Sequence, residues 1–217
     1  TFPAYSKLQD NIPKLREAYL KTLQLTAFIS IPLAGGIFIL APEFTKIFLG
    51  EQWMPIVPAM QVLTCWGIIR GFVGSISPVF MSIGNPKIVA NLQFVQAALL
   101  FILIYPLTMH WGILGASLAV ICSALVLFFI RNYILIRTIK CKTWEFYKLI
   151  LIPLALVIVS MLPVIILKFL FVDFISIYWF LLLVGVFILV FASLTYIADK
   201  LSNYGICAIL KQNFKAL

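Results

Sequence analysis

The fold of this chain is decided by two apolar runs that follow one another between Ile88 and Ile136: IVANLQFVQAALLFILIYPLTMHWGILGASLAVICSALVLFFIRNYILI. The first run, Ile88–Met109, and the second, Ile113–Ile136, are each long enough to cross the roughly 30 Å hydrocarbon core of a bilayer as a helix. The segment His110-Trp111-Gly112 between them predicts a short turn. The pair therefore predicts two antiparallel transmembrane helices.

The composition of the whole chain also favours a membrane environment. Of its 217 residues, 64% are hydrophobic and 11% are charged, and the mean hydropathy is +1.13. Ordinary globular domains are about 45–50% apolar and about 25% charged, and a water-soluble protein of this size could not hide so much apolar surface. Runs of about twenty apolar residues have the length of helices, whereas barrel strands alternate over about ten residues. We therefore expect an all-α integral membrane protein.

Four further apolar runs flank the central pair, so that six spans are expected in one helix bundle. Pro32 and the pair Gly35-Gly36 predict a kink in the first span. Before it, Ser6–Thr22 predicts an interfacial amphipathic helix capped by Asp10 or Asn11. Ala41–Pro55 predicts an interfacial loop with a short helix. The spans are expected at Leu23–Leu40, Ile56–Ile83, Ile88–Met109, Ile113–Ile136, Leu149–Phe171 and Ile177–Ile197.

These spans divide the chain into three parts. The expected parts are an amphipathic segment at 1–22, a six-helix membrane domain at 23–197 and a basic tail at 198–217. Basic loops at Arg137–Lys148 and a short turn at Val172–Ser176 connect the later spans. We take the chain to be a fragment or a truncated form of a longer protein, because it begins at Thr1.

The distribution of Lys and Arg predicts the orientation. Twelve of the sixteen basic residues fall on one side of the membrane when the six spans alternate. By the positive-inside rule this side is cytoplasmic, so both ends of the chain are expected in the cytoplasm and the protein in the inner (plasma) membrane. The net charge of +9 is thus explained by membrane topology, and no nucleic-acid partner is expected. The twelve are Lys7, Lys14, Arg16, Lys21, Lys87, Arg137, Lys140, Lys142, Lys148, Lys200, Lys211 and Lys215; Arg131 is expected near the same side.

Residues that could carry redox or metal chemistry are few. The cysteines Cys65, Cys122, Cys141 and Cys207 form no CxxC pair, so free thiols are expected, with Cys141 and Cys207 reactive from the cytoplasm. A single histidine, His110, argues against a multi-histidine metal or haem site within this chain. We expect no cofactor, no metal site and no catalytic residues, and hence a protein that is not an enzyme.

Several stretches of the chain carry a resemblance to a known family. The chain resembles the C-terminal half of Wzx-like polysaccharide flippases, which belong to the multidrug/oligosaccharidyl-lipid/polysaccharide exporter superfamily. The resemblance extends from Thr1 to about Ile136. The stretches are TFPAYSKLQDN at Thr1–Asn11, LTAFISIPLAGGIFILAPEFTKIFLGEQW at Leu25–Trp53, SIGNPK at Ser82–Lys87 and WGILGASLAV at Trp111–Val120.

The resemblance implies a fold and a function. Complete members look like two six-helix lobes, and this chain would be the C-terminal lobe of such a MATE-like transporter. Its substrate would be undecaprenyl-diphosphate-linked oligosaccharide, flipped across the inner membrane for the synthesis of cell-surface polysaccharide such as O-antigen or exopolysaccharide. The implied partners are that lipid-linked oligosaccharide, membrane lipids, the missing N-terminal lobe and the polysaccharide polymerase machinery.

Arg70 is the main candidate for substrate binding, since it lies near the middle of its span. A charge at this depth costs at least about 2.5–3.5 kcal/mol, so it should face the bundle interior or water. Its guanidinium could bind the diphosphate or an acidic sugar with two aligned donors. Alternatively, it forms a structural salt bridge or snorkels toward a headgroup.

Polar and small residues supply the other candidates. Side-chain amides and hydroxyls could bind sugar hydroxyls in a transport cavity, or could bond one helix to another. Small residues at helical spacing favour close helix packing. The candidate substrate-binding residues are Gln61, Thr64, Asn91, Gln93 and Gln96, and the candidate packing residues are Gly67, Gly71, Gly74, Gly112 and Ala116.

Three other functions stay open at this stage. A multidrug or cation antiporter of the same superfamily would need buried carboxylates, and every acid of this chain lies outside the span centres. A membrane-embedded transferase would need carboxylates or histidines near one membrane face, often with a metal. A non-transporting scaffold subunit is also compatible with the sequence.

Overall fold

A computed structural model describes residues 2–171 and 176–202 of the chain, and this part is almost entirely helical. Five of its helices are long and apolar enough to cross a membrane. The chain is therefore a multi-pass membrane protein. The elements are α1 (Phe2–Ser6), α2 (Ile12–Phe44), η1 (Thr45–Leu49), η2 (Glu51–Ile56), α3 (Val57–Ser82), α4 (Pro86–Thr138), α5 (Thr143–Leu170) and α6 (Ile177–Ser202).

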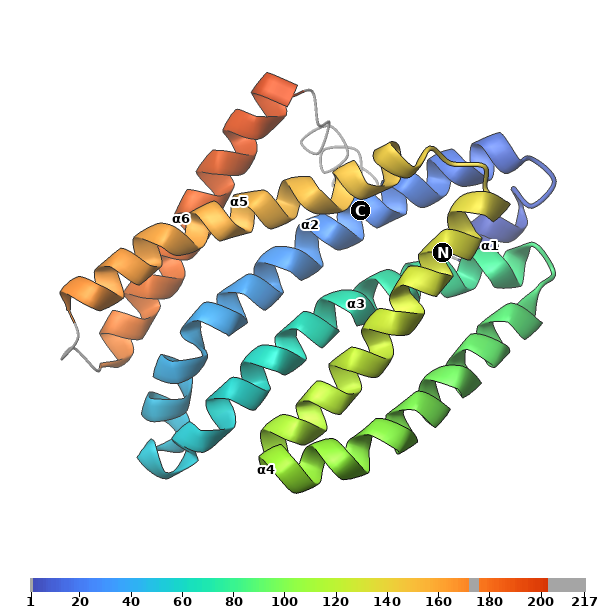
Figure 1. Cartoon of the computed structure of the whole chain (residues 1–217). Coiled ribbons are helices and arrows are strands. Elements are labelled where there is room, and N and C mark those ends of the chain that lie inside the picture. Colours follow the sequence, from blue (N-terminus) through green and yellow to red (C-terminus); the bar gives the residue numbers. More distant parts are fainter. Residues whose placement is uncertain (1, 172–175, 203–217) are drawn as a thin grey trace.

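Helix α4 contains both runs of the central pair. Its 53 residues reverse direction at Gly112, whose backbone has φ 55° and ψ −130°, a conformation that favours glycine (Figure 1). The arms on either side, 86–111 and 113–138, approach closely at Gly115, where an added methyl group would collide with the carbonyl group of Leu107. Each arm extends about 39 Å, which is enough to cross a bilayer.

The helices run back and forth between two ends of the molecule (Figure 1). One of these, which we call end A, holds the starts of α2, α4 and α5 and the ends of α3 and α4. The Gly112 turn, η1, η2 and the end of α5 lie at the opposite end. The basic residues in the helix ends and connections at end A are Lys7, Lys14, Arg16, Lys87, Arg137, Lys140 and Lys142.

The start of α2 differs from its sequence prediction. Asn11 caps the helix, as predicted, and its Oδ1 accepts a hydrogen bond of 3.2 Å from the backbone N–H of Lys14. The helix then continues unbroken through the predicted interfacial segment and the first span. Leu15 and Tyr19 are fully buried, and the Tyr19 ring stacks on Phe146 of α5 at 6.4 Å. The apolar face of this segment therefore packs against protein and not against the membrane surface.

Two of the predicted connections were wrong. Ala41–Pro55 is mostly helical and not a loop, because α2 continues to Phe44 and is followed by the single-turn helices η1 and η2, which meet at Gly50 with φ 96°. The basic loop shortens to the four residues 139–142, since α5 begins at Thr143. Helix α6 extends to Ser202, five residues past the end of the span expected at Ile177–Ile197. Residues 172–175 and 203–217, with Cys207, lie outside the described part of the chain.

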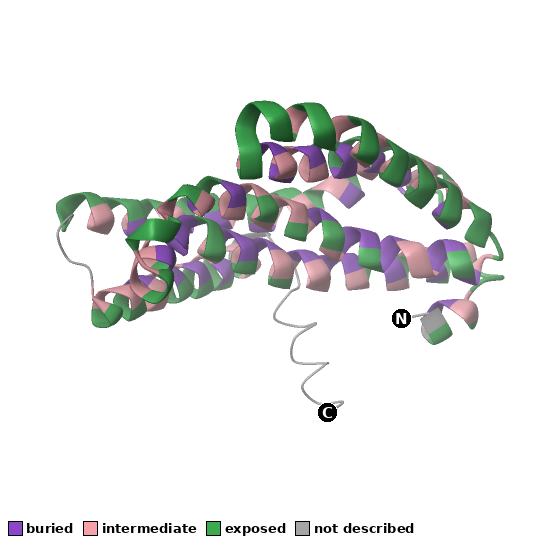
Figure 2. Cartoon of the chain, turned by 90° about the horizontal axis from the view of Figure 1, so that it is seen from below, coloured by how far each residue is buried: buried purple, intermediate pink, exposed green. Residues whose placement is uncertain are grey.

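Buried residues gather where the helices face one another, and the outward faces are exposed (Figure 2). The largest cluster joins α1, α2, α3 and α5 to the end of α4 and to α6. The first arm of α4 joins this core only at its start, through Val89, which is the only buried residue within its range 86–111. The second arm packs against α3 and buries small side chains such as Ala119, Ser123 and Ala124. The faces that stay exposed suit contact with lipid or with another helical body.

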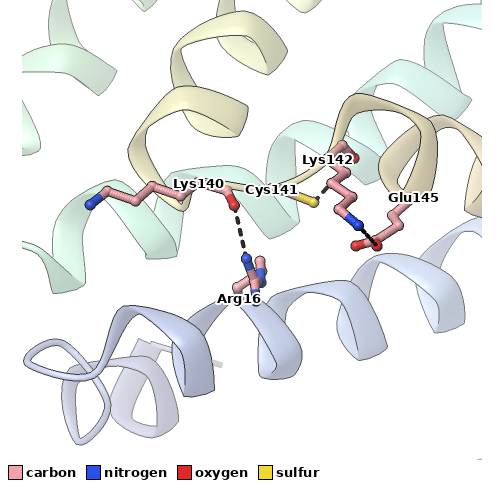
Figure 3. A network of polar contacts seen from close by, with 5 residues as sticks. All are labelled: Arg16, Lys140, Cys141, Lys142 and Glu145. Atoms are coloured by element: carbon pink, nitrogen blue, oxygen red, sulfur yellow. Dashed lines mark hydrogen bonds and ion pairs between the residues drawn. The ribbon is translucent and has the colours of Figure 1, made fainter.

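The loop between α4 and α5 is docked onto α2 (Figure 3). Arg16 donates a hydrogen bond of 2.8 Å from Nη1 to the carbonyl oxygen of Lys140. Cys141 is buried behind this contact, and its Sγ lies 3.5 Å from the carbonyl oxygen of Lys142. Burial raises the pKa of the Cys141 thiol, the charge of Glu145 raises it further, and Arg16 partly opposes both effects.

Cys141 is consequently expected to react slowly with thiol reagents, in contrast to its sequence prediction. Only the thiolate is nucleophilic, so a raised pKa shifts the rate–pH curve to higher pH, and burial lowers access as well. The measurement is the rate of maleimide labelling of native protein in membranes between neutral and alkaline pH. In a Cys141→Ser background, Lys142→Cys should label rapidly at neutral pH, because Lys142 is exposed. Equal rates for the two thiols would contradict the burial of Cys141.

Candidate functional site

Arg70 lies on an unpacked face of α3. It is twelve residues before Ser82, which places it about 18 Å from end A along the helix, near mid-span. Gly67 and Gly74, one turn away on either side, are exposed, and no atom lies within 4 Å of a side chain built at either position. Arg70 is itself exposed and forms no ion pair with any described carboxylate. The salt-bridge interpretation of Arg70 therefore has no support within residues 2–171 and 176–202.

A second arginine, Arg131, lies in the second arm of α4. It is only 6% exposed, and its Nη2 donates a hydrogen bond of 3.1 Å to Oε1 of Gln96 on the first arm. The arm that carries Arg131 packs against the part of α3 that carries Arg70, through Ala124 of α4 and Ile69 and Val73 of α3. As for Arg70, no carboxylate among the described residues pairs with Arg131.

The hydrogen bond joins the two arms of α4, and the apolar packing joins the second arm to α3. We call the polar side chains of this region, Arg70, Arg131 and Gln96, the cationic site. The charge of Arg70 at mid-span costs at least about 2.5–3.5 kcal/mol. Arg131 lies nearer the end of its arm but is buried, and a neutral amide compensates only part of the cost of burying its charge. An anion bound between the two guanidinium groups would offset the cost of both charges. The arrangement is suited to a ligand with more than one negative charge.

Sequence reasoning placed Arg131 near the cytoplasmic end of its span and did not include it in the site. The sequence feature that could have placed Arg131 beside Gln96 is the register of the two helical arms about the turn at Gly112. Residues at equal distance from a turn face each other in an antiparallel pair, so Gln96, sixteen residues before Gly112, lies opposite Phe128. Arg131 follows Phe128 by almost one turn, and helical side chains point back toward the N-terminus of their helix. Arg131 therefore reaches toward Gln96.

The remaining polar candidates do not join this site. Gln61 donates from Nε2 to the carbonyl oxygen of Phe38 at 3.1 Å, which connects α3 to α2. Thr64 donates to the carbonyl oxygen of Gln61 at 2.7 Å, within its own helix. Asn91 and Gln93 are exposed on the first arm of α4, and neither forms a hydrogen bond with an arginine among the described residues.

The candidate packing residues occupy four kinds of position. Gly71 faces α2, where a Cβ atom would lie 2.8 Å from Oγ of Ser30. Gly67 and Gly74 flank Arg70 on the open face, and Gly112 forms the turn of α4. Ala116 is half-buried in the second arm, next to the closely packed Gly115, which the sequence analysis did not select.

At the opposite end of the bundle, an ion pair connects α5 to α2. Nζ of Lys168 lies 2.7 Å from Oε2 of Glu43 and donates a hydrogen bond of 2.6 Å to the carbonyl oxygen of Ile39. Both charged side chains are largely buried. Lys168 is therefore paired within the protein at this end of the bundle.

Comparison with known proteins relates the chain to polysaccharide synthesis. Residues 1–58 match the family described as polysaccharide biosynthesis protein. An uncharacterized membrane protein in the cps region of Klebsiella pneumoniae is 31% identical over 125 residues, which cover 57% of this chain and 26% of that protein. The lipopolysaccharide biosynthesis protein WzxC of Escherichia coli K12 is 33% identical over 85 residues, covering 39% of this chain and 15% of WzxC.

A more distant relative extends the similarity along the chain. The teichuronic acid biosynthesis protein TuaB of Bacillus subtilis is 26% identical over 157 residues, which cover 70% of this chain and 32% of TuaB. The chain thus spans less than a third of the length of each of these three relatives. No solved structure matches the chain.

Proposed function

The chain belongs to the Wzx-like family of polysaccharide biosynthesis membrane proteins, and from this we propose that it forms one lobe of a flippase for lipid-linked oligosaccharide. The substrate would be an oligosaccharide carried on undecaprenyl diphosphate, which moves from the cytoplasmic to the outer leaflet of the inner membrane. The longer relatives support the presence of a second lobe, since the matched segments cover between 15% and 32% of their length.

The observation that carries this proposal is the cationic site. A diphosphate diester bears two negative charges at neutral pH, and Arg70 and Arg131 supply two positive charges without a described acid between them. A guanidinium offers fixed donors that match phosphate oxygens, and such charge-assisted hydrogen bonds are strong in a medium of low dielectric constant. Gln96 would hold Arg131 in place while Arg70, on the open face, meets the substrate first.

The described acids favour an anionic substrate over a transported cation. Antiporters that bind protons or sodium are expected to hold a carboxylate within a span. Among the described residues, the charged group near mid-span is Arg70, and each glutamate is paired with a lysine. Those glutamates are Glu17, Glu43, Glu51 and Glu145.

We also propose a membrane topology of six spans, with both arms of α4 counted separately. The reversal at Gly112 and the length of each arm support this number. End A would face the cytoplasm, because basic residues concentrate there, and the two ends of the chain would lie on that side. The exposed face of α3 around Arg70 would then line a cleft shared with the other lobe.

The decisive test compares two substrates in proteoliposomes that contain the full-length protein. One carries the oligosaccharide on a polyprenyl diphosphate and the other on a polyprenyl monophosphate. Loss of one charge-assisted contact costs about 1.5–3 kcal/mol, so the diphosphate substrate should be translocated about ten- to a hundredfold faster. Protein-free liposomes give the background rate. Equal rates for the two substrates would contradict recognition of the diphosphate by paired arginines.

A further inference from the structure

The loop between α4 and α5 carries a strained lysine. Lys140 has φ 52°, and it is the only non-glycine residue with positive φ in the described part of the chain. It occupies the position after the C-cap of α4, where the backbone N–H of Cys141 donates to the carbonyl oxygen of Ile136 at 3.0 Å. Glycine is usual at this position because it adopts positive φ without steric cost. A lysine here keeps a positive charge at the expense of backbone strain.

The geometry of the loop directs this charge outward. The carbonyl group of Lys140 faces Arg16, whereas its side chain extends away from the network of Arg16, Cys141, Lys142 and Glu145 (Figure 3). Because Arg16 bonds to the loop and Cys141 is buried beneath it, the fold holds the backbone of Lys140 in place.

Three further cations accompany Lys140 within 137–148, against one acid, Glu145. Arg137 and Lys148 are exposed and pair with no described carboxylate. Lys142 lies 4.0 Å from Glu145, at the limit of an ion pair, with 84% of its side chain exposed. The segment thus presents a surplus of positive charge at end A.

Exposed aromatic side chains of the kind that collect at membrane interfaces lie in the same segment as these cations. The guanidinium of Arg137 lies 4.4 Å from the ring centroid of Tyr133, which is 55% exposed, and Trp144 at the start of α5 is 71% exposed. Amphipathic rings collect at the membrane interface, where one part contacts acyl chains and the other contacts water. Exposed apolar residues continue into the span below them, Phe129 on α4 and Leu151 on α5.

We propose that this loop is a binding site for the phosphate-bearing headgroup of an anionic phospholipid. We call it the α4–α5 lipid site; its cations are Lys140 and Arg137. Lys142 points to the other side of the loop, beside Glu145 (Figure 3), and together with Lys148 it adds positive charge to the surrounding surface. The cations would bind the phosphate and any second acidic group of the headgroup, and Tyr133 and Trp144 would contact the start of the acyl chains. The apolar surface below the cations favours a lipid over a soluble phosphate or nucleic acid. This site is independent of the transport proposal, because it uses neither Arg70 nor Arg131.

Substitution of Lys140 separates lipid binding from stability. Lys140→Gly removes both the charge and the backbone strain. Loss of the charge should weaken binding of phosphatidylglycerol about fivefold, which corresponds to ~1 kcal/mol per basic residue at a membrane surface. Loss of the strain should raise the Tm. Lys140→Gln removes the charge and keeps the strain, so it should weaken binding equally without raising the Tm. Lys14→Gln, an exposed lysine of α2 at the same end, is the matched control and should change neither property.

Native mass spectrometry of the detergent-solubilised full-length protein would measure the binding of phosphatidylglycerol and of zwitterionic phosphatidylcholine. The site requires tighter binding of phosphatidylglycerol, and little competition from millimolar inorganic phosphate or glycerol phosphate. Effective competition by these ions would mean a phosphate site without lipid specificity and would overturn the proposal. Equal losses in Lys140→Gln and Lys14→Gln would overturn it as well, because general electrostatics would then explain the binding.

Discussion

Replacing Arg70 by alanine is expected to abolish transport of the diphosphate-linked substrate, or to lower its rate by at least about ten- to a hundredfold, in the full-length protein. The loss follows from removal of a charge-assisted contact at mid-span, where no described acid compensates. Arg70→Lys should retain part of the activity, since lysine supplies a point charge but not two aligned donors. The measurement is the initial rate of translocation in proteoliposomes with equal protein content.

A structural role for Arg70 would instead predict a lower expression level and a lower Tm for Arg70→Ala. Arg70 is exposed and its flanking glycines contact nothing, so Arg70→Ala should leave the expression level and the Tm unchanged. Arg131→Ala should lower both transport and Tm, because Arg131 is buried and bonded to Gln96. Lys87→Ala, an exposed cation at end A, serves as the control with normal transport. Normal transport by Arg70→Ala at normal protein levels would remove Arg70 from the site.

The second large effect concerns the 217-residue chain by itself. If substrate passes through a cleft between two lobes, the purified chain in liposomes should translocate lipid-linked oligosaccharide no faster than protein-free liposomes do. The reason is the open face of α3, which would expose Arg70 to lipid with no second wall to hold water or substrate. The assay monitors access of a membrane-impermeant enzyme or lectin to the sugar.

An intact longer relative, reconstituted with its own substrate, shows that the assay detects flipping. Circular dichroism of the reconstituted chain would establish that it is helical, so that inactivity is not a consequence of unfolding. Translocation by the chain alone at a rate close to that of the intact relative would refute the one-lobe proposal. It would leave the cationic site itself to be tested by the Arg70 variants.

Hydropathy located the apolar helices well and their ends poorly. The spans expected at Ile56–Ile83 and Ile177–Ile197 correspond closely to α3 and α6. Hydropathy reports on the surroundings of side chains, whereas the limits of a helix depend on backbone continuity. Helix α2 therefore extends through a polar segment whose apolar face packs on α5, and α5 begins six residues before its expected span.

The candidate site was predicted in part. Arg70 could be found from sequence because an isolated charge within an apolar run is conspicuous at any depth. Arg131 could not be assigned in the same way, since its place near the end of a run resembles an ordinary interfacial arginine. Its burial and its bond to Gln96 depend on the register of the α4 hairpin and on the packing of that hairpin against α3.

By itself the sequence determined the membrane class of this protein, the positions of its apolar runs and the accumulation of basic residues between them, because these properties follow from composition and order along one chain. The tertiary structure alone decided which polar side chains from different helices contact one another and which are buried. It brought Gln96 and Arg131 together across Gly112, buried Cys141 under the α4–α5 loop and turned the side chain of Lys140 outward. The physical reason is that such contacts join residues on different helices, and their distances are set by packing and turn geometry, not by local sequence.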